Sequence, residues 1–420
     1  MSRPPARWPA ALAALLSGPV LLLLDTAVAL LRGWEPRAGT PRALATACLA
    51  ALALGLAVAA LPPGRRLLER RWAALVTLAI SAAVSLLAAE AAARLLPRWM
   101  GGPLAHSRGP GVHRVFRPDP HLISGIHGDS YYTTSSLGIR GGEIPPGDAL
   151  RFLCVGGSTT ECTYLDDAET WPHLTMERLA TAGHPVWTGN LGISGYTTIE
   201  HLDFLEGAPA LPADGALFLV GINDFIRYLN GSIETGPRPL WRRSTLVRSV
   251  LSFHRRAFLR RLLYEVEDPT GASLVERRRV RREARDAGRL PSLDKALREY
   301  GERIAGLGRE CRRRRLRCHF LTQPVLWREN LSLSAVATFW MGEDAEGRFY
   351  SPRELRRGMD LYNATLLDTC ARHGLSCIDL GALHGREEVF YDDCHFTETG
   401  AREVARIVSA HLLAGAQEGG

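Results

Sequence analysis

The apolar positions divide the chain into two unlike parts. The first hundred residues are mostly Ala and Leu and hold three long apolar stretches, at about residues 8–31, 43–61 and 72–96. Each stretch reaches the ~20 residues that a helix needs to cross the hydrocarbon core of a bilayer. Because arginine-rich breaks separate three such runs in succession, we expect about three transmembrane helices within residues 1–97 rather than a buried helical core.

From about residue 150, short apolar runs alternate with helical patterns. This order is typical of an α/β fold, in which helices cover both faces of a parallel sheet. The strand candidates are 152–155, 186–191, 216–220, 319–322 and 376–380, and the helix candidates are 170–182, 198–206, 293–315, 352–372 and 397–413.

Two longer stretches interrupt the alternation. Residues 226–290 are strongly basic and partly amphipathic, and they fit either a helical lid packed on the core or a segment that lies on an anionic bilayer. Residues 325–350 form an aromatic loop, whose rings either stack on a ligand or fill a core. That loop carries Trp327, Phe339, Trp340 and Tyr350.

The pattern predicts three parts along the chain. Residues 1–97 are expected to form the membrane anchor, and residues 98–150 a tether segment that leads into the domain. Residues 151–415 are expected to form the α/β domain, which contains the basic insertion at 226–290.

The charge of the chain narrows the classes of partner. The net charge is +7, and almost all basic residues are arginines, with Lys295 the only lysine. A positive chain favours anionic membranes or acidic polymers. Because no motif that reads RNA or DNA accompanies the charge, nucleic acid is not an expected partner. The sequence does not indicate whether the chain has a protein partner.

The arginines also predict an orientation in the membrane. The amino-terminal tail carries Arg3 and Arg7, and the second connection packs four arginines between residues 65 and 71. Placing both groups inside leaves everything after residue 97 outside the cytoplasm. The first apolar stretch also fits a cleaved signal peptide, and the α/β domain would still be extracytoplasmic.

Two pairs of cysteines fit an oxidising compartment. Cys311 and Cys318 are seven residues apart across a helix-to-strand turn, and so are Cys370 and Cys377. Each pair fits a local disulfide or two small buried side chains. The chain has no CxxC and no Cys/His cluster with zinc spacing, so no structural metal is expected.

Polar residues follow the strand candidates at four places. These places read GGST around Ser158, NLGISG around Gly195, GIND around Asn223, and DDCH from Asp392 to His395. Because the carboxyl ends of parallel strands share one edge of a sheet, the four blocks are expected to gather there. Each block alone is weak, since glycine turns and single histidines are common; their joint occurrence is much stronger.

The residue types in these blocks fit acyl transfer. His395 can accept the proton of the Ser158 hydroxyl, and Asp392 can accept the other ring N–H of that imidazole. The Ser158 and Gly195 backbone N–H groups and the Asn223 side-chain amide are expected to stabilise an oxyanion. His384 is the alternative base and Asp393 the alternative orienting carboxylate, but the three-residue spacing favours Asp392.

The four blocks, in this order, resemble the SGNH hydrolases, also called the GDSL esterase/lipase superfamily. The flanking SLGIRG, ETWP, TQP and YDDCHFTETG are similar to its bacterial membrane-anchored members, and the resemblance spans about residues 115–413. GGS stands where the namesake motif has GDS. The resemblance implies a flavodoxin-like three-layer α/β/α fold and ester chemistry without a metal or other cofactor. By analogy, the matching roles fall on Ser158, Gly195, Asn223, Asp392 and His395.

Two further cysteines flank the predicted site. Cys162 follows Ser158 by four residues, and Cys394 directly precedes His395. One hypothesis is that they form a disulfide that braces the site, which would leave Cys154 unpaired; the alternative is that both are free thiols.

The substrate is less determined than the chemistry. An extracytoplasmic domain would meet cell-envelope glycans or lipids, so O-acyl esters of an envelope saccharide, acetyl esters first, are the favoured substrate. The alternatives are an O-acyltransferase with the same three residues, a lipid esterase or lysophospholipase at the membrane surface, and a noncatalytic envelope-binding protein.

Overall fold

The computed structural model describes residues 80–81, 84–85, 87–91, 107–147, 149–208, 211–233 and 268–418. Two of the three expected transmembrane stretches, most of the third, and residues 234–267 of the basic insertion lie outside these ranges. Within the described ranges, no helix is both long and apolar enough to cross a membrane. The described residues at 80–91 belong to one compact unit and residues 107–418 to another. The account below concerns the second unit.

A five-stranded parallel sheet forms the centre of this unit. Its strand order is β4-β3-β5-β6-β7, which is the flavodoxin-like order. All five strands overlap the predicted ones, and the last is two residues shorter at its end. Their bounds are β3 (Leu150–Gly156), β4 (Val186–Gly192), β5 (Gly215–Leu219), β6 (Arg317–Leu321) and β7 (Ser376–Ile378).

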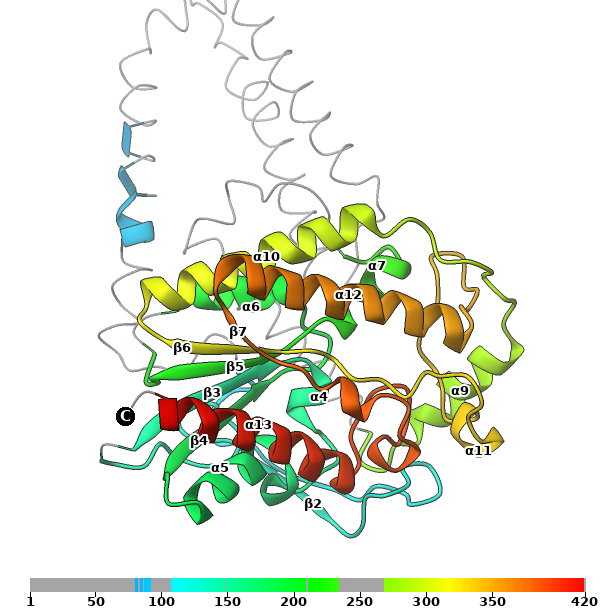
Figure 1. Ribbon diagram of the computed structural model, residues 1–420, viewed down its shortest axis with the longest axis horizontal. Coiled ribbons are helices and arrows are strands. Elements are labelled where there is room, and N and C mark those ends of the chain that lie inside the picture. The colour runs from blue at the N-terminus through cyan, green and yellow to red at the C-terminus, as the bar shows by residue number, and fades with distance from the viewer. Residues whose placement is uncertain are drawn as a thin grey trace, which may run out of the picture. The chain divides into compact units, whose positions relative to one another are not determined.

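Helices cover both faces of the sheet, as Figure 1 shows. One face carries α5 (Trp171–Thr181) and α13 (Glu398–Glu418), and the other carries α6 (Thr198–Gly207), α10 (Asp294–Arg313) and α12 (Pro352–His373). The five predicted helices therefore exist, and the expected α/β class is confirmed for this unit. The shorter helices are α4 (Ser158–Glu161), α7 (Ile222–Leu229), α9 (Ser273–Glu283), α11 (Leu333–Val336), η1 (Asp167–Glu169), η3 (Gly381–Leu383) and η4 (Glu387–Val389).

Local chemistry sets the ends of α12. The Ser351 hydroxyl accepts a hydrogen bond from the Glu354 backbone N–H, and Pro352 occupies the first turn, where no N–H is needed. Gly374 ends the helix with a φ of 59°, a left-handed conformation that glycine adopts without strain. The helix therefore begins where the sequence predicts and ends one residue later.

The core lies between the central strands and the helices. All five residues of β5 are buried, and the rings of Phe218 and Phe320 stack with centroids 5.2 Å apart across β5 and β6. A central parallel strand is buried on both faces, which explains its continuous apolar run.

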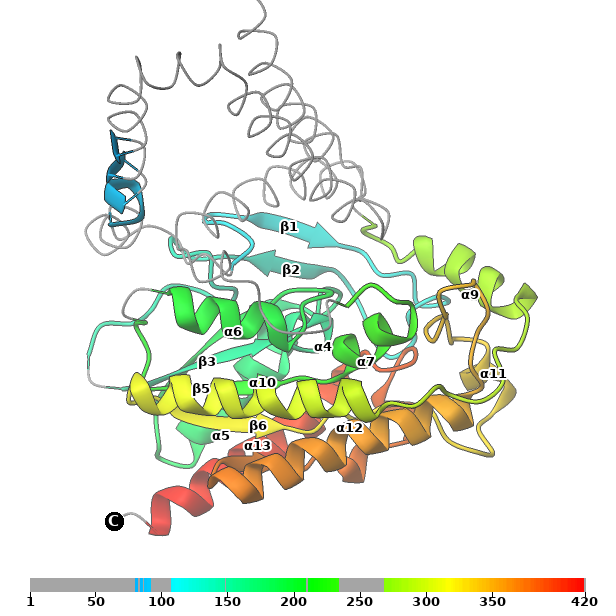
Figure 2. The same ribbon diagram turned by 90° about the horizontal axis from the view of Figure 1, so that it is seen from above.

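Residues 107–147 of the expected tether segment belong to the same compact unit as the sheet. They contain the antiparallel strands β1 (His113–Phe116) and β2 (Ser130–Thr133), which lie side by side in Figure 2. After β2, the backbone of Arg140 exchanges two hydrogen bonds, of 3.0 and 3.1 Å, with Asn190 of the edge strand β4. This part of the segment therefore covers the sheet edge.

The described end of the basic insertion packs on the domain. From α9, Arg278 donates to the carbonyls of Thr338 and Leu122, and Arg281 donates to those of Met341 and Tyr350. These contacts fit the lid interpretation for this part of the insertion. In the aromatic loop, Trp327, Phe339 and Tyr350 are buried, and Trp340 is half-buried.

The structure contains both of the local disulfides, Cys311–Cys318 and Cys370–Cys377. The expected Cys162–Cys394 disulfide is wrong, because both residues are free thiols, as is Cys154. The Cys394 Sγ atom packs 3.8 Å from Met341 Sδ, and the Cys162 thiol donates to the Thr159 carbonyl at 3.3 Å. The two thiols therefore contact different residues and do not bond to each other.

Candidate active site

Two glycines shape the turn between β3 and the helix that begins with Ser158. A Cβ atom at Gly156 would lie 2.6 Å from the Leu219 carbonyl oxygen, and one at Gly157 would lie 2.3 Å from Asn223 Nδ2. Glycine is therefore required at position 156 by the neighbouring strand, and a side chain at position 157 would displace the Asn223 amide. The turn places Ser158 at the carboxyl end of β3.

Ser158, His395 and Asp392 form a continuous hydrogen-bonded chain. The Ser158 Oγ atom lies 2.7 Å from His395 Nε2. On the other side of the ring, His395 Nδ1 lies 2.7 Å from Asp392 Oδ2 and 2.9 Å from Oδ1. Asp392 Oδ1 also accepts the backbone N–H groups of Cys394 and His395 at 3.0 and 2.9 Å, which fixes the carboxylate within its turn.

The two charged members of this chain shift each other's pKa. Burial works against the charged form of the imidazole, but the adjacent Asp392 carboxylate outweighs it, and the pKa of His395 is raised well above 6.5. Burial likewise works against the Asp392 carboxylate, but His395 and the surrounding donors lower the pKa of Asp392. The imidazolium is therefore stabilised where the proton of Ser158 would arrive.

The two alternative residues lie in other environments. Asp393 accepts the Trp327 indole N–H at 2.7 Å and the Trp340 backbone N–H at 2.8 Å. Burial and the neighbouring Asp392 raise the pKa of Asp393. His384 Nδ1 accepts the Val325 backbone N–H at 3.2 Å, and burial lowers the pKa of this histidine. Asp393 and His384 therefore each accept a hydrogen bond from the aromatic loop at 325–350.

Two aromatic residues that the sequence did not predict at the site flank the imidazole. The rings of Trp340 and Tyr391 lie within 6° and 13° of parallel to His395, with centroids 6.2 and 5.6 Å away. The Trp340 indole N–H also donates to Asp392 Oδ2 at 2.9 Å. Tyr391 directly precedes the DDCH block, which was the available signal for it.

The second and third polar blocks meet beside the serine turn. Asn223 lies in the first turn of α7 and donates from Nδ2 to the Tyr196 carbonyl at 2.9 Å. Tyr196 follows Gly195, whose φ of 78° is the left-handed conformation that favours glycine. Because Asn223 Nδ2 also approaches Gly157, the structure gathers the Ser158, Gly195 and Asn223 blocks at one edge of the sheet.

A small, partly open pocket adjoins Ser158 and His395. Its lining combines apolar and aromatic residues with Ser158 and His395, two members of the hydrogen-bonded chain. The other lining residues are Ile126, Cys162, Tyr164, Leu165, Tyr391 and Phe396.

Among the described residues, one group of potential metal ligands comprises Asp392, Cys394 and His395. Asp392 and His395 already bind each other, and burial raises the pKa of the Cys394 thiol to about 11, which disfavours a thiolate ligand. The donors thus fit the hydrogen-bonded chain better than a metal ion.

One known protein family matches most of the α/β domain. Residues 154–403, more than half of the chain, match the GDSL-like Lipase/Acylhydrolase family. The chain belongs to this family and is therefore a hydrolase that acts on ester bonds. No curated protein matches it.

Some solved structures match the chain at low identity and low TM-score. The alpha/beta hydrolase LAE5, from the metagenome of Lake Arreo in Spain, is 13% identical with a TM-score of 0.38, over 63% of this chain and 96% of that protein. A variant of an acetyl xylan esterase from Geobacillus stearothermophilus is 14% identical with a TM-score of 0.37, over 63% of this chain and 95% of that one. At these values the likeness carries no argument about substrate.

Proposed function

We propose that this protein is a serine esterase in which Ser158 is the nucleophile, His395 the general base and Asp392 the residue that orients it. The observation that carries the proposal is the unbroken chain from Ser158 Oγ through both ring nitrogens of His395 to the Asp392 carboxylate. The family membership supplies the reaction class, which is cleavage of ester bonds.

The chain of hydrogen bonds accounts for both halves of the reaction. As Ser158 Oγ bonds to the ester carbonyl carbon, its proton passes to His395 Nε2, and Asp392 stabilises the imidazolium. When the tetrahedral intermediate collapses, the bond to the leaving alcohol breaks and His395 returns the proton to that oxygen. Water, deprotonated by His395, then attacks the acyl-enzyme and releases the acid and free Ser158.

Three donors are proposed for the oxyanion of the tetrahedral intermediate. They are the backbone N–H groups of Ser158 and Gly195 and the Asn223 side-chain amide. Asn223 is already held by the Tyr196 carbonyl, so its amide loses little freedom when it binds the oxyanion. Such preorganised donors stabilise a transition state without reorganisation at the moment of reaction.

The pocket beside Ser158 supports a short acyl group. A small apolar wall around Tyr164, Leu165 and Phe396 suits an acetyl group better than a long chain. We therefore favour O-acetyl esters of a cell-envelope saccharide as substrates. The location follows from the three apolar stretches and their arginines, which support a membrane anchor and an extracytoplasmic domain.

The direct test assays the detergent-purified full chain on p-nitrophenyl acetate and on longer p-nitrophenyl esters. We expect turnover with the highest kcat/KM for acetate, loss by at least about 10⁴-fold in Ser158→Ala, and fluorophosphonate labelling of Ser158 alone. Absence of both turnover and labelling would refute the esterase and favour a binding protein. A preference for long chains would instead favour the lipid esterase.

Product analysis with an acetylated oligosaccharide separates two fates of the acyl-enzyme. Release of acetate supports hydrolysis. Appearance of acetate on an added acceptor sugar, without free acetate, would favour the O-acyltransferase.

A further inference from the structure

Glu161 is a buried carboxylate that the mechanism above does not use. It lies three residues after Ser158, at the last position of the same short helix α4, and only 2% of it is exposed. A buried charge is costly unless partners compensate it, so its contacts bear on why it is there.

Two groups of partners hold the Glu161 carboxylate. From the tether segment, Arg108 donates from both Nε and Nη2, to Oε1 at 2.5 Å and to Oε2 at 2.7 Å. From the turn after β4, Ser194 donates to Oε2 through its backbone N–H at 2.7 Å and its hydroxyl at 2.5 Å. Tyr132 of β2 completes the set through its hydroxyl, 3.3 Å from Oε1.

The carboxylate is held in its charged form. Burial by itself favours the neutral acid, but Arg108 and Ser194 outweigh it and lower the pKa of Glu161. Both carboxylate oxygens therefore act as hydrogen-bond acceptors at neutral pH.

Ser194 connects this carboxylate to the proposed oxyanion donors. It directly precedes Gly195, and the end of β4, two residues before Ser194, lies so close to α4 that a Cβ atom at Gly192 would be 2.1 Å from the Glu161 backbone nitrogen. The Glu161 side chain thus joins the helix that begins with Ser158 to the turn that carries the Gly195 N–H.

We propose that Glu161, held by Arg108, is a positioning residue that fixes the Gly195 backbone N–H relative to Ser158 Oγ. This inference rests on the proposed function. It also assigns a role to the tether segment, because its Arg108 supplies the counter-charge that keeps the oxyanion donors in place.

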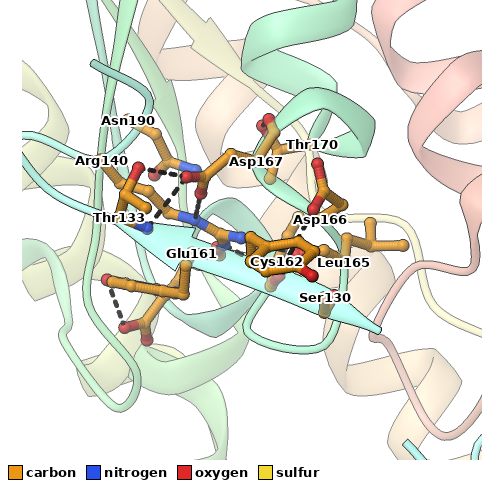
Figure 3. A network of polar contacts seen from close by, with 12 residues as sticks. Ser130, Thr133, Arg140, Glu161, Cys162, Leu165, Asp166, Asp167, Thr170 and Asn190 are labelled. Carbon is orange, nitrogen blue, oxygen red and sulfur yellow. Dashed lines mark hydrogen bonds and ion pairs between the residues drawn. The ribbon is translucent and has the colours of Figure 1, made fainter. Parts of the chain in front are cut away.

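A purely structural ion pair would also be buried, and a neighbouring interaction provides the matched control. Arg140 clamps the backbone at the end of α4: it pairs with Asp167 at 2.6 Å and donates to the carbonyls of Glu161, Cys162 and Leu165. Figure 3 shows this clamp. Within the described part of the chain, the Arg140 side chain holds the backbone that follows α4 and donates no hydrogen bond to Ser194 or Gly195, so Asp167→Asn tests stability alone.

The experiment compares Glu161→Gln with Asp167→Asn in the full chain, with p-nitrophenyl acetate as substrate and an alkylboronic acid as a tetrahedral analogue. For Glu161→Gln we expect kcat to fall about 30-fold or more, towards the 10²–10³ range of a lost oxyanion donor, with KM within about threefold. Affinity for the boronic acid should fall by a similar factor. For Asp167→Asn we expect a lower Tm and a kcat within about threefold of the parent.

A kcat for Glu161→Gln no lower than that for Asp167→Asn, at matched folded fraction, would overturn the positioning role. Should Glu161→Gln not fold, Ser194→Ala decides instead, because this exposed residue loses only its hydroxyl contact. A fall in kcat of about threefold or more at unchanged Tm supports the role, and an unchanged kcat overturns it. If Ser158→Ala retains parental activity, the proposed function itself fails, which is a distinguishable result.

Discussion

The indole N–H of Trp340 donates a 2.9 Å hydrogen bond to Asp392 Oδ2, the oxygen that also lies 2.7 Å from His395 Nδ1. The next carboxylate along the chain, Asp393, receives the indole N–H of Trp327 at 2.7 Å. Two tryptophans of the 325–350 loop therefore each hold one of two adjacent carboxylates. The loop thus helps to hold the Asp392 carboxylate of the candidate site in place.

This relationship predicts different consequences for two similar substitutions. Trp340→Phe keeps a ring beside His395 but removes a donor from Asp392, so we expect kcat to fall about tenfold, as for the loss of one hydrogen bond to a charged group. The substitution is measured through kcat/KM on p-nitrophenyl acetate, with Tm recorded in parallel.

Trp327→Phe is the matched control, because it removes the equivalent bond from Asp393. Trp327 is fully buried, so we expect a lower Tm, and a kcat within about threefold. A larger kcat loss in Trp327→Phe than in Trp340→Phe would contradict this division of roles.

The two carboxylates themselves are expected to differ in the same way. Asp392→Asn removes the charge that stabilises the His395 imidazolium, and we expect kcat to fall by about 10³–10⁴-fold with a small change in Tm. Asp393→Asn leaves the contact between His395 and Asp392 intact and replaces a carboxylate that accepts three N–H groups. It should mainly lower the free energy of unfolding, by about 1–3 kcal/mol.

Urea unfolding and steady-state kinetics on both variants check this pair. Equal kcat losses in the two variants, at full folding, would show that the carboxylates cannot be assigned separate roles.

The sequence located the strands and the four polar blocks because these are local signals. An apolar run that ends in glycine and a polar residue predicts the carboxyl end of a parallel strand, as at Ser158 and Asn223. The contacts of Glu161 are different. Its partner Arg108 is 53 residues away, and nothing in either local pattern names the other.

The Cys162–Cys394 disulfide hypothesis is wrong for a related reason, because local sequence does not determine which side chains meet. Both cysteines lie next to site residues in sequence, but nearness along the chain does not set the direction of a thiol. Cys162 takes a left-handed conformation, with a φ of 52°, at the end of α4, and its thiol turns back to the Thr159 carbonyl.

The raised pKa of His395 predicts an activity that needs neutral to alkaline conditions. The base acts only in its neutral form, so activity is lost as the pH falls through this pKa, and the acid limb of kcat/KM should have its midpoint above 6.5. Asp392→Asn removes the charge that raises the pKa, while burial still lowers it. The residual activity of this variant should therefore show an acid limb at lower pH.

A full pH profile of kcat/KM for the parent and for Asp392→Asn tests the sign. A midpoint that stays in place or moves to higher pH in the variant would be incompatible with the assigned partner of His395.

The two disulfides predict a redox-dependent stability and an oxidising location. Each closes a short loop between neighbouring elements, so removing one by a Cys→Ser pair should cost about 2–3 kcal/mol of unfolding free energy. The bonds lie outside the Ser158 site, so kcat below the unfolding transition should stay within about threefold.

Mass mapping of the membrane-purified protein under non-reducing conditions provides the check. It should find Cys311 joined to Cys318 and Cys370 joined to Cys377, with Cys162 and Cys394 as free thiols. Four reduced cysteines at the disulfide positions in freshly trapped protein would argue against the proposed extracytoplasmic location.

The close approach of Gly157 to Asn223 predicts a thermodynamic coupling between them. In Gly157→Ala, the added methyl would lie 2.3 Å from Asn223 Nδ2 and must displace that amide. The φ of −86° at Gly157 is open to alanine, so the effect comes from this contact rather than from a left-handed backbone. We expect kcat to fall about 10²-fold, close to the loss in Asn223→Ala.

A double-mutant cycle on kcat measures the coupling. If Gly157→Ala acts by moving Asn223, it should cost little more once Asn223 is already alanine, so the two losses are far from additive. Gly415→Ala serves as the control, since its added methyl meets nothing within 4 Å, and it should leave kcat unchanged. Additive losses in the double variant would mean that the Gly157 methyl disturbs Ser158 directly, and the case for Asn223 as an oxyanion donor would then rest on its own substitution alone.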